Sequence, residues 1–340
     1  MGALRNLVSR RQLFALAGGA ALLSACSSDS SKSAATTTVE TTKPTTKPTT
    51  TTAAETTTTA ETTTTVAETT TTVAPDPVQP LTGLPLDDPT LLTRVTLVVK
   101  VSNDKGARPQ TGLNDADIVF ETWGSGPTRF ATIWHSRELD FVGPIRSCRE
   151  QDVNLVGEFN RAVFACSGGN GGNIALLRSN AGPDRTGPAQ QFHYRALGEA
   201  ATAGDPMSGF DLQIQQVFVQ WRFDATTGKY VRDQDRKPHL LADKTQVYTD
   251  NVIIAFLDYE PSSTDGRSPD GQTTGTGPAL VFTGGTMVAA NWSRDDRLNP
   301  FSFTGPDGTP VLLTPGRTFI ELPNSGKGSF VGNDKFTLVP

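Results

Sequence analysis

The sequence has few of the residues that build metal centres, disulfide frameworks and nucleic-acid-binding faces. Its 340 residues include three histidines and three cysteines, and the histidines lack the spacing of a metal motif such as His-Glu-x-x-His. The formal net charge is −5, and no run of lysine or arginine follows the first 25 residues. Because binding many phosphates of a nucleic acid requires a basic face, we expect no nucleic-acid partner. The small number and the spacing of the histidines and cysteines also lead us to expect no metal, and we expect no cofactor.

Motifs of common enzyme classes are also missing. The glycine-rich stretch Ser167–Gly172 lacks the Gly-Lys-Ser/Thr ending of a P-loop and does not match the dinucleotide-binding fingerprint. Ser102 and Lys105 have the Ser-x-x-Lys spacing of penicillin-recognising enzymes, but the companion Ser-Asp-Asn and Lys-Thr-Gly motifs do not occur. We therefore predict no catalytic residues on these grounds and favour a non-enzymatic protein.

The first 25 residues are typical of an export signal that ends at a lipidation site. A basic start precedes an apolar run, Leu13–Leu23, which is too short for a retained membrane-spanning helix. Residues 9–14 also match the twin-arginine export pattern. The run ends in Leu-Ser-Ala-Cys, where bacterial lipoprotein precursors receive acyl chains such as palmitate and are cleaved. We predict that Cys26 is lipidated and holds the protein on the extracytoplasmic face of the cell membrane.

A threonine-rich segment separates this predicted anchor from the first predicted strands. Residues 36–72 are mostly threonine, interrupted by Lys-Pro pairs and by Glu-Thr-Thr-Thr-Thr repeats. Such a segment has almost nothing to bury, so residues 26–79 are predicted to form a disordered linker. A plain spacer and an O-glycosylated stalk both fit this composition. Loss of residues 1–25, with three arginines and no acidic residue, would leave a mature chain of formal charge about −8.

The remaining sequence predicts an α+β fold in two domains. In residues 80–200, apolar runs alternate with short helical patterns, which favours a mixed α/β domain. In residues 210–340 almost every apolar run is strand-like and turn signals separate the runs, which favours a β-rich, mainly antiparallel domain. Residues 262–277 are predicted to form a mobile loop. The predicted helices are Gln151–Phe159 and Asn173–Leu177, and the predicted strands of the second half include Ile214–Phe223, Asn251–Tyr259, Ala279–Thr283 and Thr318–Leu322.

Arginine and glycine gather in loops of the first predicted domain. Guanidinium groups beside glycine amides are suited to hold a carboxylate or a phosphate through paired hydrogen bonds. The predicted ligand-binding residues are Arg108, Arg129, Arg146, Arg149, Ser167, Gly168 and Gly169. A structural alternative is that the arginines pair with nearby carboxylates and only fix the loops. The carboxylates considered for this pairing are Asp117, Glu121, Glu150 and Asp152.

The two cysteines outside the signal allow two interpretations. Cys148 and Cys166 could form a disulfide, since such bonds persist outside the cytoplasm. They could equally be two small buried side chains. Sequence alone does not place their Cα atoms within bonding range of each other.

The arginine and glycine stretches resemble the YerB-like family of bacterial lipoproteins. The likeness rests on Arg-Pro-Gln-x-Gly-Leu from Arg108, Ala-Asp-Ile-Val-Phe-Glu from Ala116, Thr-Arg-Phe from Thr128 and Gly-Pro-Ile-Arg-Ser-Cys-Arg from Gly143. It covers nearly all of residues 80–323 and continues through Tyr230–Arg232, Asn251–Ile254, Gly275–Pro278, Asn291–Trp292 and Gly316–Ile320. The resemblance implies an extracytoplasmic α+β lipoprotein without an established activity.

Two positions depart from the family pattern. Residues 191–195 lack the Pro-His-Asn that the family usually carries there, so no role is carried over to them. Cys148 stands where the family more often has alanine, and its presence together with Cys166 favours the disulfide interpretation.

We thus expect a ligand-binding or scaffolding lipoprotein of the cell envelope, with a cell-wall polymer or an envelope protein as its partner. The alternative is a cell-wall glycan or peptide hydrolase that uses Asp117 or Glu121 as general base and Arg129 to hold the substrate charge. A third hypothesis gives the strand-rich half a partner-docking role through its edge strands.

Overall fold

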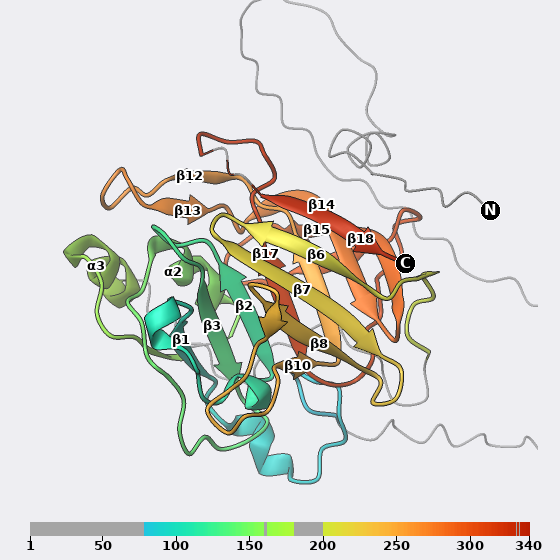
Figure 1. Cartoon of the computed structure of the whole chain (residues 1–340). Helices are drawn as coiled ribbons and strands as arrows, with labels where there is room; N and C mark the ends of the chain where they lie inside the picture. The colour runs from blue at the N-terminus through green and yellow to red at the C-terminus, as the bar shows by residue number, and fades with distance from the viewer. Residues whose placement is uncertain (1–77, 160–161, 180–199, 331, 333) are drawn as a thin grey trace, which may run out of the picture. The chain divides into compact units, whose positions relative to one another are not determined.

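The computed structural model describes residues 78–159, 162–179, 200–330, 332 and 334–340 (Figure 1). The predicted export signal, Cys26, the threonine-rich linker up to residue 77 and residues 191–195 lie outside the described residues. Within the described part of the chain, no helix has the length and apolar character needed to cross a membrane.

The larger sheet takes its ten strands from both predicted domains. Its order is β16-β15-β14-β11-β17-β2-β3-β1-β4, with β5 paired to β15. β17 lies between β2 and β11 and is parallel to both, so a strand from near the C-terminus connects the two halves. The strands are β1 Leu97–Ser102, β2 Ile118–Thr122, β3 Arg129–Trp134, β4 Val163–Ala165, β5 Asp205–Pro206, β11 Asn251–Ala255, β14 Gly275–Thr283, β15 Thr286–Arg294, β16 Ser302–Thr304 and β17 Thr318–Leu322.

A second, antiparallel sheet has six strands in the order β10-β8-β7-β6-β18, with β9 paired to β8. Its apolar side chains share one buried cluster with side chains of the larger sheet, so the two sheets pack face to face. A second cluster lies on the other face of the larger sheet, where α2 contributes Leu155. The strands are β6 Gly209–Ile214, β7 Val217–Asp224, β8 Lys229–Gln234, β9 Lys237–Pro238, β10 Tyr248–Thr249 and β18 Lys335–Val339.

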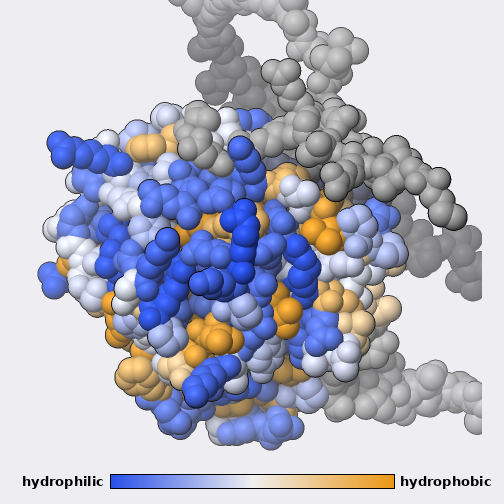
Figure 2. Space-filling model, viewed as in Figure 1, coloured by the Kyte–Doolittle hydropathy of each residue, from blue (hydrophilic) through white to orange (hydrophobic). Residues whose placement is uncertain are grey.

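Burial on both faces explains why the central strands are nearly continuous apolar runs. In β2, Ile118 and Phe120 face the α2 side while Val119 faces the second sheet. Covered strands of this kind lack the polar alternation of a half-exposed sheet. The outer surface in the view of Figure 2 is mostly hydrophilic, with small separate hydrophobic patches.

Helices are few in the part of the chain that the structure describes. They are α2 Glu150–Gly157, α3 Gly171–Ser179 and the short 3₁₀ segments η1 Pro89–Thr93, η2 Lys105–Ala107 and η3 Leu113–Asp115. Strands β12 Tyr259–Pro261 and β13 Pro269–Gly271 form a small hairpin, which lies with α2 and α3 at one end of the molecule (Figure 1). The fold is therefore strand-rich with mixed and antiparallel sheets, which confirms the predicted fold class in this coarse form.

Several predicted elements agree closely with the structure and others differ. β17 has the predicted bounds, whereas the predicted strand Ile214–Phe223 is interrupted by a turn in which Gln215 has φ +54°. The predicted loop 262–277 contains β13 and the start of β14. The predicted boundary between residues 200 and 210 separates two stretches of sequence that share one sheet.

Candidate functional site

Three of the four predicted arginines come together beside the start of α2. Arg129 opens β3, and its Nη1 donates to the carbonyl of Ser147 at 3.0 Å. Arg149 directly precedes α2, and its Nη1 donates to the carbonyl of Cys148 at 3.0 Å. Burial and the nearby charges of Arg149 and Arg146 lower the pKa of Arg129 to about 10. The sequence therefore folds three cations into one region in which their charges repel.

The predicted glycine loop runs alongside these arginines. The amide of Ser167 donates to the carbonyl of Arg146 at 3.0 Å, and the amide of Cys148 donates to the carbonyl of Gly168 at 2.9 Å. A Cβ on Gly169 would lie 2.5 Å from the Cys148 sulfur, so only glycine permits this close approach. We call Arg129, Arg146, Arg149 and the segment Ser167–Gly169 the arginine cluster.

Arg108 does not belong to the arginine cluster. Its Nη1 forms an ion pair with Asp235 at 2.9 Å, and its Nη2 donates to the carbonyl of Asn103 at 3.0 Å. The expectation that Arg108 acts beside the other three arginines therefore finds no support in the structure. Asp235 lies 127 residues further along the chain, so local sequence could not reveal this partner.

The carboxylates that could neutralise the arginine cluster mostly have other partners. Asp152 accepts from Lys100 Nζ at 2.5 Å, and Glu150 accepts from Ser262 Oγ at 2.7 Å. Arg146 forms an ion pair with Asp104 at 2.9 Å. Among the described residues, no carboxylate lies within ion-pair distance of Arg129 or Arg149.

The region consequently carries an excess of positive charge. Arg129 is 5% exposed and Lys100 is fully buried, and burial lowers the pKa of Lys100 although Asp152 opposes the shift. The Nε atom of Arg149 is buried and has no hydrogen-bond partner among the residues that the structure describes. An incoming anion could supply the missing acceptor.

The second half of the chain contributes one wall of this region. Asn170 Nδ2 donates to Thr264 Oγ1 at 3.1 Å, and Asn170 Oδ1 accepts from the amide of Asn173 in the first turn of α3. Asp265 lies near enough to Arg149 for its charge to raise the pKa of that arginine, although burial has the larger, lowering effect. Sequence reasoning missed Thr264 and Asp265, because their contacts cross about a hundred residues of chain.

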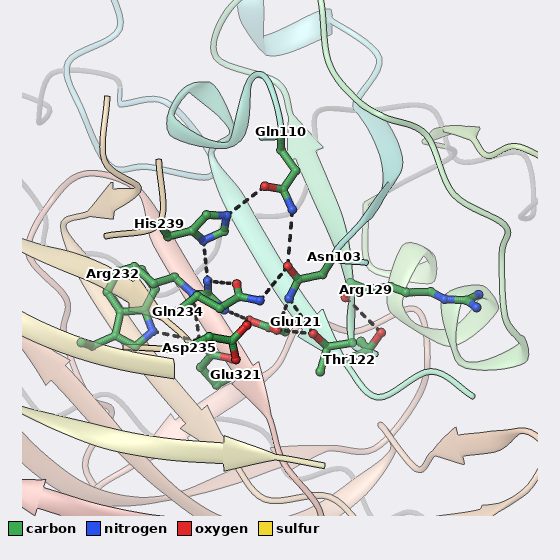
Figure 3. A network of polar contacts seen from close by, with 12 residues as sticks. Asn103, Gln110, Glu121, Thr122, Arg129, Arg232, Gln234, Asp235, His239 and Glu321 are labelled. Atoms are coloured by element: carbon green, nitrogen blue, oxygen red, sulfur yellow. Dashed lines mark hydrogen bonds and ion pairs between the residues drawn. The ribbon is translucent and has the colours of Figure 1, made fainter. Parts of the chain in front are cut away.

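A separate polar network lies buried between the two sheets (Figure 3). Glu121 and Glu321 are register neighbours on β2 and β17, and Arg232 Nη2 contacts Glu121 Oε2 at 2.6 Å. Trp221 Nε1 donates to Glu321 Oε1 at 2.8 Å. We call this set the buried network. Its further members are Asn103, Gln110, Thr128, Gln234 and His239.

The buried network holds one cation against two carboxyl groups. The Arg232 guanidinium is also enclosed by the rings of Phe130 and Phe319, whose centroids lie 5.6 and 5.5 Å away. Burial, followed by the nearby charge of Glu121, raises the pKa of Glu321 well above its usual range. The raised pKa favours the neutral, protonated form of Glu321 beside the ion pair of Arg232 and Glu121.

Asp117 and Glu121, the carboxylates of the hydrolase alternative, are both buried. Asp117 accepts from the amides of His135 at 2.6 Å and Ser136 at 2.8 Å, and Glu121 belongs to the buried network. The two carboxylates do not lie on an exposed strand face, because β2 is covered on both faces. Their placement gives the hydrolase alternative no support.

Comparison with known proteins identifies the family. Residues 81–204 match the model described as "Protein of unknown function (DUF3048) N-terminal domain", and residues 210–320 match "Protein of unknown function (DUF3048) C-terminal domain". The chain belongs to this family. It is 26% identical over 290 residues to the Bacillus subtilis (strain 168) protein named "Putative lipoprotein YerB", covering 72% of this chain and 85% of the relative.

The fold agrees with that of a solved structure. The crystal structure of the YerB protein from Bacillus subtilis matches with a TM-score of 0.64 at 22% identity, covering 77% of this chain and all of that one. The predicted resemblance to the YerB-like lipoproteins is thus confirmed.

Cys148 and Cys166 carry free thiols in this DUF3048 chain. Cys148 is fully buried, and burial followed by the neighbouring Cys166 raises its pKa to about 12. No group of three or more His, Cys, Asp or Glu side chains among the described residues is placed to hold a metal ion.

Proposed function

We propose that this protein is a lipoprotein anchored through Cys26 on the extracytoplasmic face of the cell membrane, and that its folded part binds an anionic ligand at the arginine cluster without catalysing a reaction. One observation carries the proposal. Arg129 is buried and Arg149 is half-buried, yet among the described residues neither has a carboxylate within ion-pair distance. The surrounding carboxylates are engaged by Lys100, Arg146 and serine hydroxyls.

Desolvation makes an unmatched guanidinium costly, and a bound anion would offset that cost. A hydrogen bond to a charged group contributes about 1.5–3 kcal/mol. Four cations, Lys100 and the three arginines, lie near three carboxylates, Asp104, Asp152 and Asp265. This excess favours a phosphate group over a carboxylate as the ligand. A phosphate-bearing cell-wall polymer or an acidic envelope protein would present such groups to a tethered domain.

The ligand prediction is tested by calorimetric titration of the full-length protein in detergent with inorganic phosphate, and with acetate as the carboxylate probe. We expect saturable phosphate binding that is tighter than acetate binding. Arg149→Gln should weaken phosphate binding about tenfold or more, because one charge-assisted hydrogen bond is lost.

Arg108→Gln is the matched control, since Arg108 lies outside the arginine cluster and should leave phosphate affinity unchanged. Equal weakening by both substitutions, or no phosphate binding at millimolar concentration, would contradict the proposed ligand site. The anchor is tested separately: Cys26→Ser should move the protein from the membrane pellet to the soluble fraction, and an unchanged distribution would argue against lipidation at this position.

A further inference from the structure

Two thiols lie on or beside two of the backbone segments that contribute to the arginine cluster. Cys148 stands between Arg146 and Arg149, and Cys166 directly precedes Ser167. Backbone hydrogen bonds join the two segments, from Ser167 to Arg146 and from Cys148 to Gly168. Cys166 lies near enough to Cys148 to raise the pKa of that thiol, and the missing Cβ of Gly169 leaves room for the Cys148 sulfur.

We propose that Cys148 and Cys166 form an intramolecular disulfide in the exported protein, and that this bond fixes the loops that carry the arginine cluster. The bond would join the end of β4 to the segment before α2. The two segments are already paired through their backbones next to both cysteines, which keeps the two positions close together in the folded chain. The effect on ligand affinity rests on the proposed function, but formation of the bond does not.

The exposure of the two thiols sets the order of the reaction. Cys166 is half-buried, whereas Cys148 is fully buried and its raised pKa, about 12, keeps it protonated. The Cys166 thiolate therefore attacks the disulfide of an extracytoplasmic thiol oxidant, breaking that bond and releasing one thiolate. Cys148 then loses its proton to solvent and attacks the Cys166 sulfur, which releases the second thiolate. Two electrons pass to the oxidant, which ends as two thiols.

A bond between residues 148 and 166 would restrict the unfolded chain and hold Ser167–Gly169 against Arg146. Arg146 and Arg149 would then keep their positions without a bound anion. A preorganised site binds more tightly, because less conformational entropy is lost on binding. The expected gain in phosphate affinity is several-fold.

Intact-mass and peptide analysis after alkylation tests the bond in full-length protein purified from membranes without reductant. We expect the peptides of Cys148 and Cys166 to be linked, and linkage to reappear when reduced protein is treated with oxidised glutathione. The oxidised form should unfold at a temperature higher by about 5 °C than the reduced form. Cys166→Ser should abolish the linkage and this difference. Alkylation of both thiols in the membrane-derived protein, or a link between two chains, would overturn the proposal.

Phosphate titration of the oxidised and reduced forms separates the two proposals. Tighter binding by the oxidised form would support the coupling, and equal affinity would refute it. If the peptides are linked and neither form binds phosphate, the bond stands and the proposed function fails.

Discussion

The buried network and the arginine cluster both contain arginines removed from water, but they differ in how charge is balanced. Arg232 is fully buried, contacts Glu121 at 2.6 Å and is enclosed by aromatic rings. Arg129 is 5% exposed, lies near two further arginines and, among the described residues, donates its side-chain hydrogen bond to a backbone carbonyl. The arginine between the sheets is thus paired with a carboxylate of the chain, whereas Arg129 has no such partner in the part of the chain that the structure describes.

The largest expected effect on the free energy of unfolding comes from removing Arg232, the cation of the buried network. Arg232→Met would leave Glu121 charged and buried beside Glu321, and loss of one partner of a buried ion pair costs about 3–5 kcal/mol. Urea unfolding followed by tryptophan fluorescence measures this loss. Arg232→Lys, which keeps a charge, should recover part of it. A loss below about 1 kcal/mol for Arg232→Met would show that the ion pair does not hold the sheets together.

A smaller effect is expected from the neutral acid of the same network. The folded-state pKa of Glu321 is raised above the ordinary 4.5 by burial and by Glu121. The stability that its protonated form provides is therefore fully present below pH 4.5 and is lost as pH rises through the folded-state pKa. Glu321→Gln cannot ionise, so we expect it to be more stable than the wild type at alkaline pH and to show a flatter profile. Unfolding free energies measured from pH 5 to pH 9 test this, and parallel profiles would refute a neutral Glu321.

A still smaller effect on stability is expected at Arg108, which pairs with Asp235 but is partly exposed. The side chains of Arg108 and Asp235 are 21% and 33% exposed, and solvent screening limits such pairs to about 0–1 kcal/mol. Arg108→Ala should therefore lower the unfolding free energy by less than about 1 kcal/mol in the same urea assay. Asp235→Ala should give a similar loss. A much larger loss in either variant would show that this pair stabilises the fold as strongly as the ion pair of the buried network does.

The smallest effect on stability is expected within the arginine cluster. Arg129→Met removes a desolvated charge that is repelled by Arg149 and Arg146, so relief of repulsion should offset the lost hydrogen bond to Ser147. In phosphate-free buffer we expect the unfolding free energy to change by less than about 1 kcal/mol, while phosphate no longer stabilises the variant. A loss as large as that of Arg232→Met would mean that Arg129 also serves the fold.

The difference between the buried network and the arginine cluster could be predicted only in part from the sequence. The clustering of Arg129, Arg146, Arg149 and the glycine loop was predicted, because short motifs place each of them at an end of a strand or helix. The ion pair of Arg108 with Asp235, away from the other arginines, was not predicted. The contacts of Thr264 and Asp265 with the glycine loop were not predicted either. These contacts join residues roughly a hundred positions apart, and local pattern carries no information about such pairs.

The same limit applied to the fold. Apolar runs located β17 to the residue and indicated a strand-rich chain, but nothing in the run Thr318–Leu322 indicates that it lies between β2 and β11. The sequence offers Glu121 as a candidate general base of the hydrolase alternative. It does not reveal Arg232 as the partner of Glu121, because 111 residues separate the two.

The sequence by itself determined the strand-rich class, the family, the predicted export and anchoring segment, and the gathering of arginine and glycine in neighbouring motifs, because composition and short-range pattern are properties of neighbouring residues. Only the tertiary structure decided which arginines have carboxylate partners. That distinction depends on distance and desolvation, and both are set when the two sheets pack and bring Arg232 to Glu121 while Arg129 is left beside other cations.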